Sequence, residues 1–332
     1  MTETLDGISV VLLYAAMGLY AVAFIAFTLD LARRGAARTA VESGAERIAA
    51  ARAAGAAGAA GAASRPGILA TLERPAPFGP ERNRESPSLR VAVVLTVVGW
   101  LLHLGATVLR GVAGARVPWA NMYEFAMTGT LLITAVFLGL LLRRDLRFLG
   151  AGITGLVVLM LGVATVGFRV DVVPLPPALQ SYWLVLHVLV AILGTAFFTI
   201  GFALSVVQLL QARRDADPTS RLRLPAAVPD AGALENAAYR VVIVGFIFWT
   251  FTLIAGAIWA EHAWGRYWGW DTKEVWTFII WVVFAGYIHA RATRGWRGSR
   301  SAWLAIVGYS AVLFNFGIVN VFFKGLHAYS GL

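Results

Sequence analysis

Residues 8–29 read ISVVLLYAAMGLYAVAFIAFTL, a run of 22 positions without a charged side chain. As an α-helix, a run of this length spans roughly 30 Å, which is the thickness of the hydrocarbon core of a bilayer. The preceding residues, MTETLDG, lack the basic segment that begins a cleavable signal peptide. We therefore expect residues 8–29 to be retained as a transmembrane helix.

The rest of the chain has a similar composition. Its 332 residues are 59% hydrophobic and 14% charged, with a mean hydropathy of +0.72, whereas about a quarter of a typical soluble domain is charged. None of the further apolar runs alternates as barrel strands do. The sequence predicts an all-α polytopic membrane protein with about eight transmembrane helices, at 8–29, 90–109, 124–142, 148–168, 183–210, 240–260, 275–291 and 302–323.

The distribution of basic residues predicts the orientation of these helices. Of the 28 Lys and Arg residues, 22 follow the odd-numbered spans and six lie on the other side. Because cytoplasmic loops carry an excess of Lys and Arg, both termini are predicted on the outer face. The net charge of +10 is mostly this topology signal, and without a soluble basic domain it does not predict nucleic-acid binding.

Residues 31–89 differ from the rest of the chain because they are rich first in Ala and Gly and then in Pro. We expect a disordered cytoplasmic loop, although its Ala- and Arg-rich first half favours transient helix. The predicted organisation is a first transmembrane helix at 1–30, this loop at 31–89, and a membrane domain at 90–332. The chain has no cysteine, so any thiol chemistry belongs to a partner or a substrate.

The most unusual outer segment is the loop at 259–276, WAEHAWGRYWGWDTKEVW. Six of the twelve tryptophans fall between residues 259 and 281. An interfacial aromatic belt would spread them over many helix ends, whereas here they gather beside glycines that let the backbone turn closely around a flat group. A ligand-binding loop is therefore favoured over a membrane anchor. Its central residues are Trp264, Gly265, Trp268, Gly269 and Trp270.

Two carboxylates near the predicted outer face have a structural interpretation. Asp271 is followed three residues later by Glu274 and then by an apolar helix, which is the pattern of an N-terminal capping box. Asn121 and Glu124 repeat the pattern before the third predicted helix. For Glu124 and Asp271, helix capping is favoured over acid–base catalysis.

The chain has five histidines, and two of them, His187 and His327, lie near the predicted outer face at helix ends. A lone helical histidine is more often a hydrogen-bonded interior residue than a ligand, but an ionisable residue at membrane depth favours a functional role. Near an aromatic surface, such histidines suggest axial ligands for iron in a flat macrocycle. The sequence contains neither an HExxH motif nor a P-loop, so a zinc hydrolase or a P-loop nucleotide hydrolase is unsupported.

The octapeptide WGRYWGWD at 264–271 fits the WGxxWxWD signature of the haem-handling membrane proteins of cytochrome c maturation. Its wider context at 256–291 resembles the CcsA/ResC branch of this family, which is named CcsB in some bacteria. The similarity extends over roughly residues 90–332. Three further segments resemble that branch, namely PWANMYE (118–124), YWLVLHV (182–188) and GLHAYSG (325–331).

The resemblance implies a subunit of a cytochrome c synthase (haem lyase) in the bacterial plasma membrane. Together with a ResB/CcsB-type membrane partner, such a protein carries haem to the outer face and joins it to the C-x-x-C-H motif of apocytochrome c. Haem b is then the bound substrate. The resemblance implies outer axial ligands His187 and His327, an inner histidine His289 on the haem route, and a binding loop of Trp264, Gly265, Trp268, Trp270 and Asp271.

Several assignments stay open. His262 stands where the family has a small or amide residue and is not expected to be a ligand, and His103 matches no family histidine. The alternatives to a synthase subunit are a haem exporter or chaperone that presents haem without attaching it, and a scaffold with an aromatic anchor. Five residues are candidate partners for the haem propionates: Arg110, Arg116, Arg169, Arg266 and Lys324.

Overall fold

The computed structural model describes residues 1–59, 86–175, 180–217, 228–293, 295–323 and 325–327. Every regular element within these ranges is a helix. Eight stretches among the described residues are long and apolar enough to cross a membrane, which confirms the predicted fold class. The protein is therefore a polytopic α-helical membrane protein.

The eight stretches agree with the predicted spans, with ends that differ by up to nine residues. The last stretch, Ser299–Phe322, is divided into three elements. The elements are α1 (Thr2–Ala59, with Thr2–Ala36 as the candidate span), α2 (Pro87–Gly114), α3 (Met122–Leu141), η1 (Arg147–Leu149), α4 (Gly150–Gly167), α5 (Tyr182–Ala216), α6 (Ala231–Trp264), α7 (Thr272–Ala292), α8 (Ser299–Leu313), the π-helix η3 (Phe314–Val319) and α9 (Asn320–Phe322).

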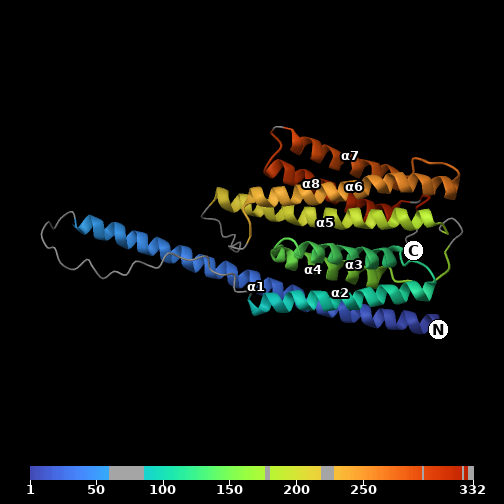
Figure 1. Cartoon of the computed structure of the whole chain (residues 1–332), viewed down its shortest axis with the longest axis horizontal. Helices are drawn as coiled ribbons and strands as arrows, with labels where there is room; N and C mark the ends of the chain where they lie inside the picture. The colour runs from blue at the N-terminus through green and yellow to red at the C-terminus, as the bar shows by residue number, and fades with distance from the viewer. Residues whose placement is uncertain (60–85, 176–179, 218–227, 294, 324, 328–332) are drawn as a thin grey trace.

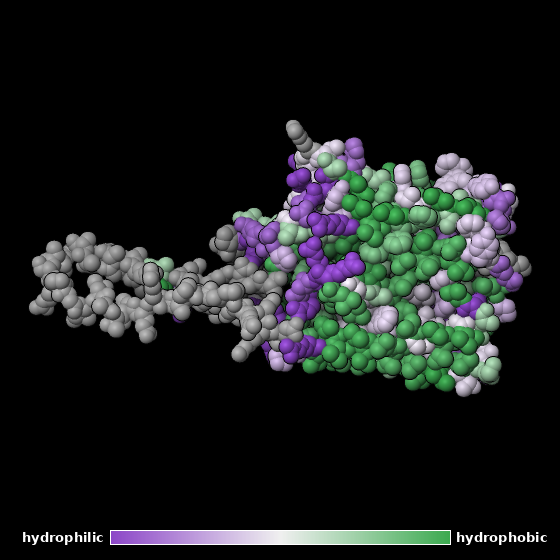
Figure 2. Space-filling view, viewed as in Figure 1, coloured by the Kyte–Doolittle hydropathy of each residue, from purple (hydrophilic) through white to green (hydrophobic). Residues whose placement is uncertain are grey.

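The spans lie side by side along the long axis of the molecule (Figure 1). The N-terminus and the α2–α3, α4–α5 and α6–α7 connections share one end, which we call the N-terminal end (right in Figure 1). Figure 2 shows apolar residues over the middle of the visible face and hydrophilic residues gathered toward the opposite end. The α3–η1 connection, which contains Arg143 and Arg144, lies at that end. Its cytoplasmic orientation remains a prediction from the charge pattern.

Helix α1 does not end near residue 30, where the sequence predicted the start of a loop. It continues through the Ala-rich segment to Ala59, because alanine and arginine have high helix propensity. Residues 60–85 lie outside the described residues, so the predicted disorder of this part is untested. Helix α2 begins at Pro87, close to the predicted start of the membrane domain at residue 90.

Two groups of buried apolar side chains hold the helices together. The larger one includes residues of α1 to α6, such as Tyr20, Tyr123 and Ile200. The second joins α5 and α6 to α7 and α8, and at its centre the rings of Phe198 and Phe284 stack at 3.7 Å between centroids. Helices α5 and α6 belong to both groups. They therefore form the central pair of the bundle and position the site described below.

A buried ionic cluster holds the N-terminal end of α1, α2 and α3 together. Arg110 donates to Asp6 at 2.6 Å, to Glu124 at 3.0 Å and to the Val170 carbonyl at 2.8 Å. Arg116 donates to Glu124 at 2.5 Å. The predicted cap is also present, because Asn121 accepts from the Glu124 amide at 2.9 Å. The Glu124 carboxylate is thus a central acceptor of the cluster, which sequence reasoning did not predict.

Candidate functional site

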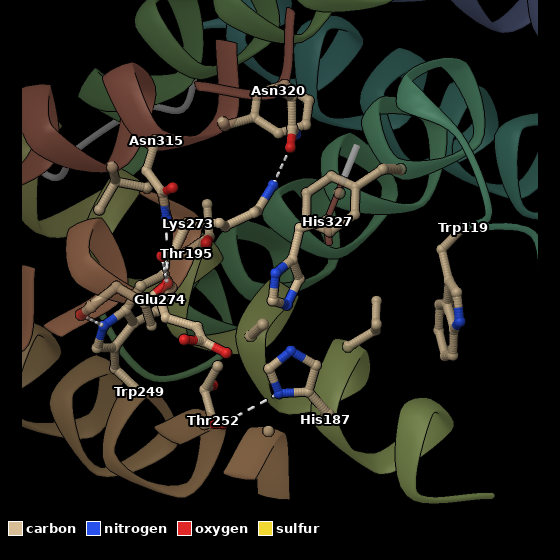
Figure 3. Close-up of a pocket in the computed structure, with 18 of the residues that line it drawn as sticks. Trp119, His187, Thr195, Trp249, Thr252, Lys273, Glu274, Asn315, Asn320 and His327 are labelled. Atoms are coloured by element: carbon tan, nitrogen blue, oxygen red, sulfur yellow. Dashed lines mark hydrogen bonds between the residues drawn. The ribbon is translucent and has the colours of Figure 1, made fainter. Parts of the chain in front are cut away.

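A cavity opens near the N-terminal end, between the first turns of α3 and α5, the last turns of α6, the start of α7 and the segment from α8 to residue 327. It holds about 1560 Å³ of space, counting its open mouth, and its wall is mainly apolar and aromatic. His187, Trp259, Trp268 and His327 all line it. Figure 3 shows His187 and His327 with their imidazole rings facing one another in the cavity.

The His187 ring is held on three sides. It lies in the second turn of α5, and its Nδ1 donates to the Thr252 carbonyl of α6 at 3.0 Å. One face stacks on Trp259, with 5.8 Å between ring centroids and 14° between planes. Gly256 provides the room, because a Cβ there would lie 2.7 Å from Cε1 of His187. A carbonyl can only accept, so Nδ1 carries the proton and Nε2 keeps its lone pair.

His327 is oriented in the same manner by a carboxylate. Its Nδ1 donates to Oδ2 of Asp271 at 2.8 Å. Its ring meets Trp264 edge-on at 5.0 Å and Trp259 edge-on at 5.6 Å between centroids. In the neutral ring that carries its proton on Nδ1, Nε2 of His327 keeps a lone pair, as Nε2 of His187 does. An imidazole whose Nδ1–H is held by a carbonyl or carboxylate is the typical form of a metal-ligating histidine.

Asp271 has two roles, of which only one was predicted. It caps α7, and with Glu274 it forms the predicted capping box. It also accepts from the Leu326 amide at 3.1 Å and from His327. The hydrogen bond from His327 is the main reason why the pKa of Asp271 lies below its ordinary value. The cap of α7 is thus also the residue that positions His327, 56 residues later in the chain.

Of the residues in the predicted binding loop, only Trp268 lines the cavity, and the others have different positions. Trp268 forms part of the cavity wall, whereas Trp264 packs edge-on against the His327 ring. Gly265 ends α6 in the left-handed conformation, with φ at 70°. Gly269 donates its amide to Glu274 at 2.9 Å. Trp270 does not line the cavity; its side chain is 76% exposed, and it contacts Trp268 edge-on.

The other three histidines do not line this cavity. His289 is exposed in the last turn of α7, at the end of the bundle opposite to His187 and His327. His103 is buried in α2, 3.5 Å from the Tyr20 hydroxyl of α1. His262 is exposed, and its Nδ1 donates to the Ile258 carbonyl of its own helix.

Of the predicted candidates for binding an anionic group, none that is described lines the cavity. Arg110 and Arg116 are engaged with Glu124, Arg169 pairs with Asp6, Arg266 is exposed, and Lys324 lies outside the described residues. Lys273 and Asn320 line the cavity instead. Sequence reasoning missed both. The only signal was the position of Lys273 in the first turn of α7, directly after the tryptophan motif.

Within the described ranges, no group of three or more His, Cys, Asp or Glu side chains is arranged to hold a metal ion. Two opposed imidazoles in an aromatic cavity are a different type of site. Such a pair could hold the metal of a flat ring whose own atoms fill the other metal positions. The residues present thus fit a flat metal macrocycle.

Comparison with known proteins agrees with this chemistry. Residues 119–327 match the family described as "Cytochrome C assembly protein". The chain is 35% identical over 242 residues to the cytochrome c biogenesis protein CcsA of Guillardia theta, covering 67% of this chain and 80% of the relative. It is 34% identical to CcsA of Prochlorococcus marinus, covering 74% and 85%, and 34% identical to CcsA of Chlamydomonas reinhardtii, covering 73% and 69%. The chain therefore belongs to the cytochrome c assembly protein family and, within it, to the CcsA type.

Proposed function

We propose that this chain binds haem b between His187 and His327 and presents it for covalent attachment to the C-x-x-C-H motif of apocytochrome c. Family membership gives the protein a role in cytochrome c biogenesis. The observation that carries the finer proposal is the opposed pair of imidazoles, each with Nδ1 bound to an acceptor. Both Nε2 atoms are then available as iron ligands.

The residues of this chain need to position the reactants and nothing more. Haem supplies the vinyl groups and the apocytochrome supplies the thiols, since this chain has no cysteine. Holding the two in near-attack geometry is worth an effective molarity of about 10⁵ M or more. His187 and His327 would hold the iron, and Trp259 and Trp268 would line the ring. One imidazole must later yield to the histidine of C-x-x-C-H.

The proposal includes a partner and an orientation. The arginine-rich end of the bundle would face the cytoplasm, so the cavity would open at the outer face of the bacterial plasma membrane. A ResB/CcsB-type membrane protein would be the partner. His289 is exposed at the opposite end of α7. It is available there as the inner histidine on the haem route, with a second ligand contributed by the partner.

Reconstitution tests this function. The chain, its partner and an apocytochrome c are co-expressed in a host that lacks cytochrome c maturation genes, and covalent haem is measured by in-gel haem staining. We expect covalent haem only when both membrane proteins are present, and a bis-histidine Soret spectrum in the purified chain. Haem that is bound but never attached would support a chaperone. A colourless protein, together with normal cytochrome c production in both the His187→Ala and the His327→Ala variants, would support a scaffold.

Gly256→Ala should weaken haem binding by about 10- to 100-fold, because the new methyl group overlaps the His187 ring and pushes it away from Thr252. Alanine has a higher helix propensity than glycine, so α6 itself should not be destabilised. Haem titration of the purified protein, followed at the Soret band, measures the effect.

Gly286→Ala in α7 is the matched control, because a Cβ there meets nothing within 4 Å. We expect this variant to bind haem as the wild type does. Equal haem affinity in both alanine variants would contradict the proposed position of His187.

Asp271→Asn should reduce haem affinity by about 10- to 100-fold, since an amide is a weaker acceptor for His327 than a carboxylate.

The folded-state pKa of Asp271 is lowered. Its contribution to stability is therefore fully present above the unfolded-state pKa of about 4, and it is lost as the pH falls through the folded-state pKa. The difference in melting temperature between wild type and variant should therefore be present at about pH 5 and shrink as the pH falls below about 4. A difference that does not shrink between about pH 4 and pH 2 would refute this assignment.

A further inference from the structure

The charge of the haem cavity is carried by very few side chains. Among its described lining residues, Lys273 is the one Lys or Arg, and Glu274 is the one carboxylate. Glu274 is already bound, because its Oε2 accepts from the amides of Gly269 and Asp271 at 2.9 and 3.0 Å. Lys273 is therefore the one basic side chain of the described lining that can form an ion pair with an anionic ligand.

The Lys273 ammonium has a neutral partner. It donates to Oδ1 of Asn320 in α9 (Figure 3). Nδ2 of Asn320 in turn contacts the Met122 sulfur at 3.2 Å. The nearby Asp271 carboxylate accepts from His327 and Leu326 and forms no ion pair with Lys273 within the described part of the chain. Lys273 is partly buried, and charged groups that are removed from water in proteins are usually paired with an opposite charge. An ammonium that faces a cavity with only an amide as its partner is suited to a ligand anion.

The other predicted outer cations that the structure describes are not available for this role. Arg110, Arg116 and Arg169 are engaged with Asp6 and Glu124, away from the cavity wall. Arg266 lies over Gly269, on the exposed side of the loop. Lys273 and His327 instead line the same cavity, and both also line the small pocket beside it.

We propose that Lys273, together with Asn320, binds a carboxylate of the haem and so fixes the rotation of the ring in the cavity. This inference rests on the proposed function. Two axial imidazoles leave the macrocycle free to rotate about the axis that joins them. An ion pair at one edge removes that freedom, and it is strong in an apolar cavity. The rotation decides where the two vinyl groups lie, so Lys273 is a positioning residue for attachment.

Comparing haem with its dimethyl ester tests the inference, because the ester has the same ring and iron but no carboxylates. Both are titrated into purified wild-type protein, Lys273→Gln and Lys273→Arg, and the Soret spectra give affinity and coordination. We expect Lys273→Gln to weaken haem binding by about tenfold or more, to leave ester binding unchanged, and to keep the bis-histidine spectrum. Lys273→Arg should retain most of the affinity for haem.

Arg266→Gln is the matched control, since it removes an exposed outer cation and should bind both ligands as the wild type does. Melting curves of every variant show whether the fold is intact. If Lys273→Gln loses the same affinity for haem and for the ester, or loses affinity for neither, Lys273 does not bind a haem carboxylate. Either result leaves the proposed His187–His327 site intact. If wild-type protein binds neither ligand with a bis-histidine spectrum, the proposed function falls and this inference falls with it.

Discussion

His327→Ala should convert the bound haem from a six-coordinate, low-spin form to a five-coordinate form, weaken binding by about 100-fold and abolish cytochrome c maturation. The residue is proposed to supply one of the two axial ligands, and no other described histidine lines the cavity besides His187. Removing it also leaves the Asp271 carboxylate without its main side-chain partner. His187→Ala should have a similar spectral effect, since its imidazole is the opposed ligand.

Addition of free imidazole distinguishes the loss of a ligand from the loss of the fold. Imidazole at millimolar concentration should restore the low-spin spectrum in both alanine variants, because the cavity left by the side chain admits it. His262→Ala serves as the control, since His262 is exposed and donates only to its own helix. A low-spin bis-histidine spectrum that persists in the double variant His187→Ala/His327→Ala would exclude this site as the haem site.

The membrane spans could be predicted because hydropathy depends on composition alone. Each predicted run became part of a helix, but the ends differ where polar residues continue the helix beyond the apolar run. Helix α6 is an example. It begins at Ala231 and not near residue 240, and Asp230 caps it by accepting from Ala233 at 2.8 Å. Helix α1 likewise continues through Ala-rich sequence in which no hydropathy signal marks an end.

The site was predictable only in part. The resemblance to CcsA proteins selected His187 and His327, and the structure brings both to one cavity. The groups that orient these rings, namely the Thr252 carbonyl and the Asp271 carboxylate, lie 65 and 56 residues away in the chain. No local pattern reveals such pairs. The motif also predicted that Trp270 and Trp268 are both binding residues. Trp270 instead has a positive φ, and its side chain points outward.

The roles of the basic residues were also only partly predictable from the sequence. Counting charges placed Arg110 and Arg116 on the outer side, where they were candidates for binding an anion. Tertiary contacts instead pair them with Glu124, and among the described lining residues of the cavity the one Lys or Arg is Lys273. The sequence contains the charges but not their pairing, because pairing depends on how α1, α2 and α3 approach one another.

Arg110→Met should destabilise the protein by about 3–5 kcal/mol and lower its melting temperature by roughly 5–10 °C, the largest effect expected outside the proposed haem site. The Arg110 side chain is 0% exposed and holds α1 through Asp6 and α3 through Glu124. Methionine fills a similar volume but leaves both carboxylates with one fewer cation in a region that excludes water. Removing one partner of a buried ion pair destabilises a protein by more than the intact pair stabilises it, because the other charge is left buried without a partner. The destabilisation should therefore be partly reversed by adding Asp6→Asn to Arg110→Met.

Arg147→Met is the matched comparison, because Arg147 pairs at 2.7 Å with Asp145, whose side chain is 51% exposed. The pair is partly exposed to solvent, so its loss should cost at most about 1 kcal/mol. Differential scanning calorimetry in detergent measures both variants. If Arg110→Met melted within about 2 °C of the wild type, or no higher after addition of Asp6→Asn, the ionic cluster would not be what ties α1 to α2 and α3. The predicted order of stability is wild type, Arg147→Met, Arg110→Met/Asp6→Asn and then Arg110→Met, since each step leaves more buried charge without a partner.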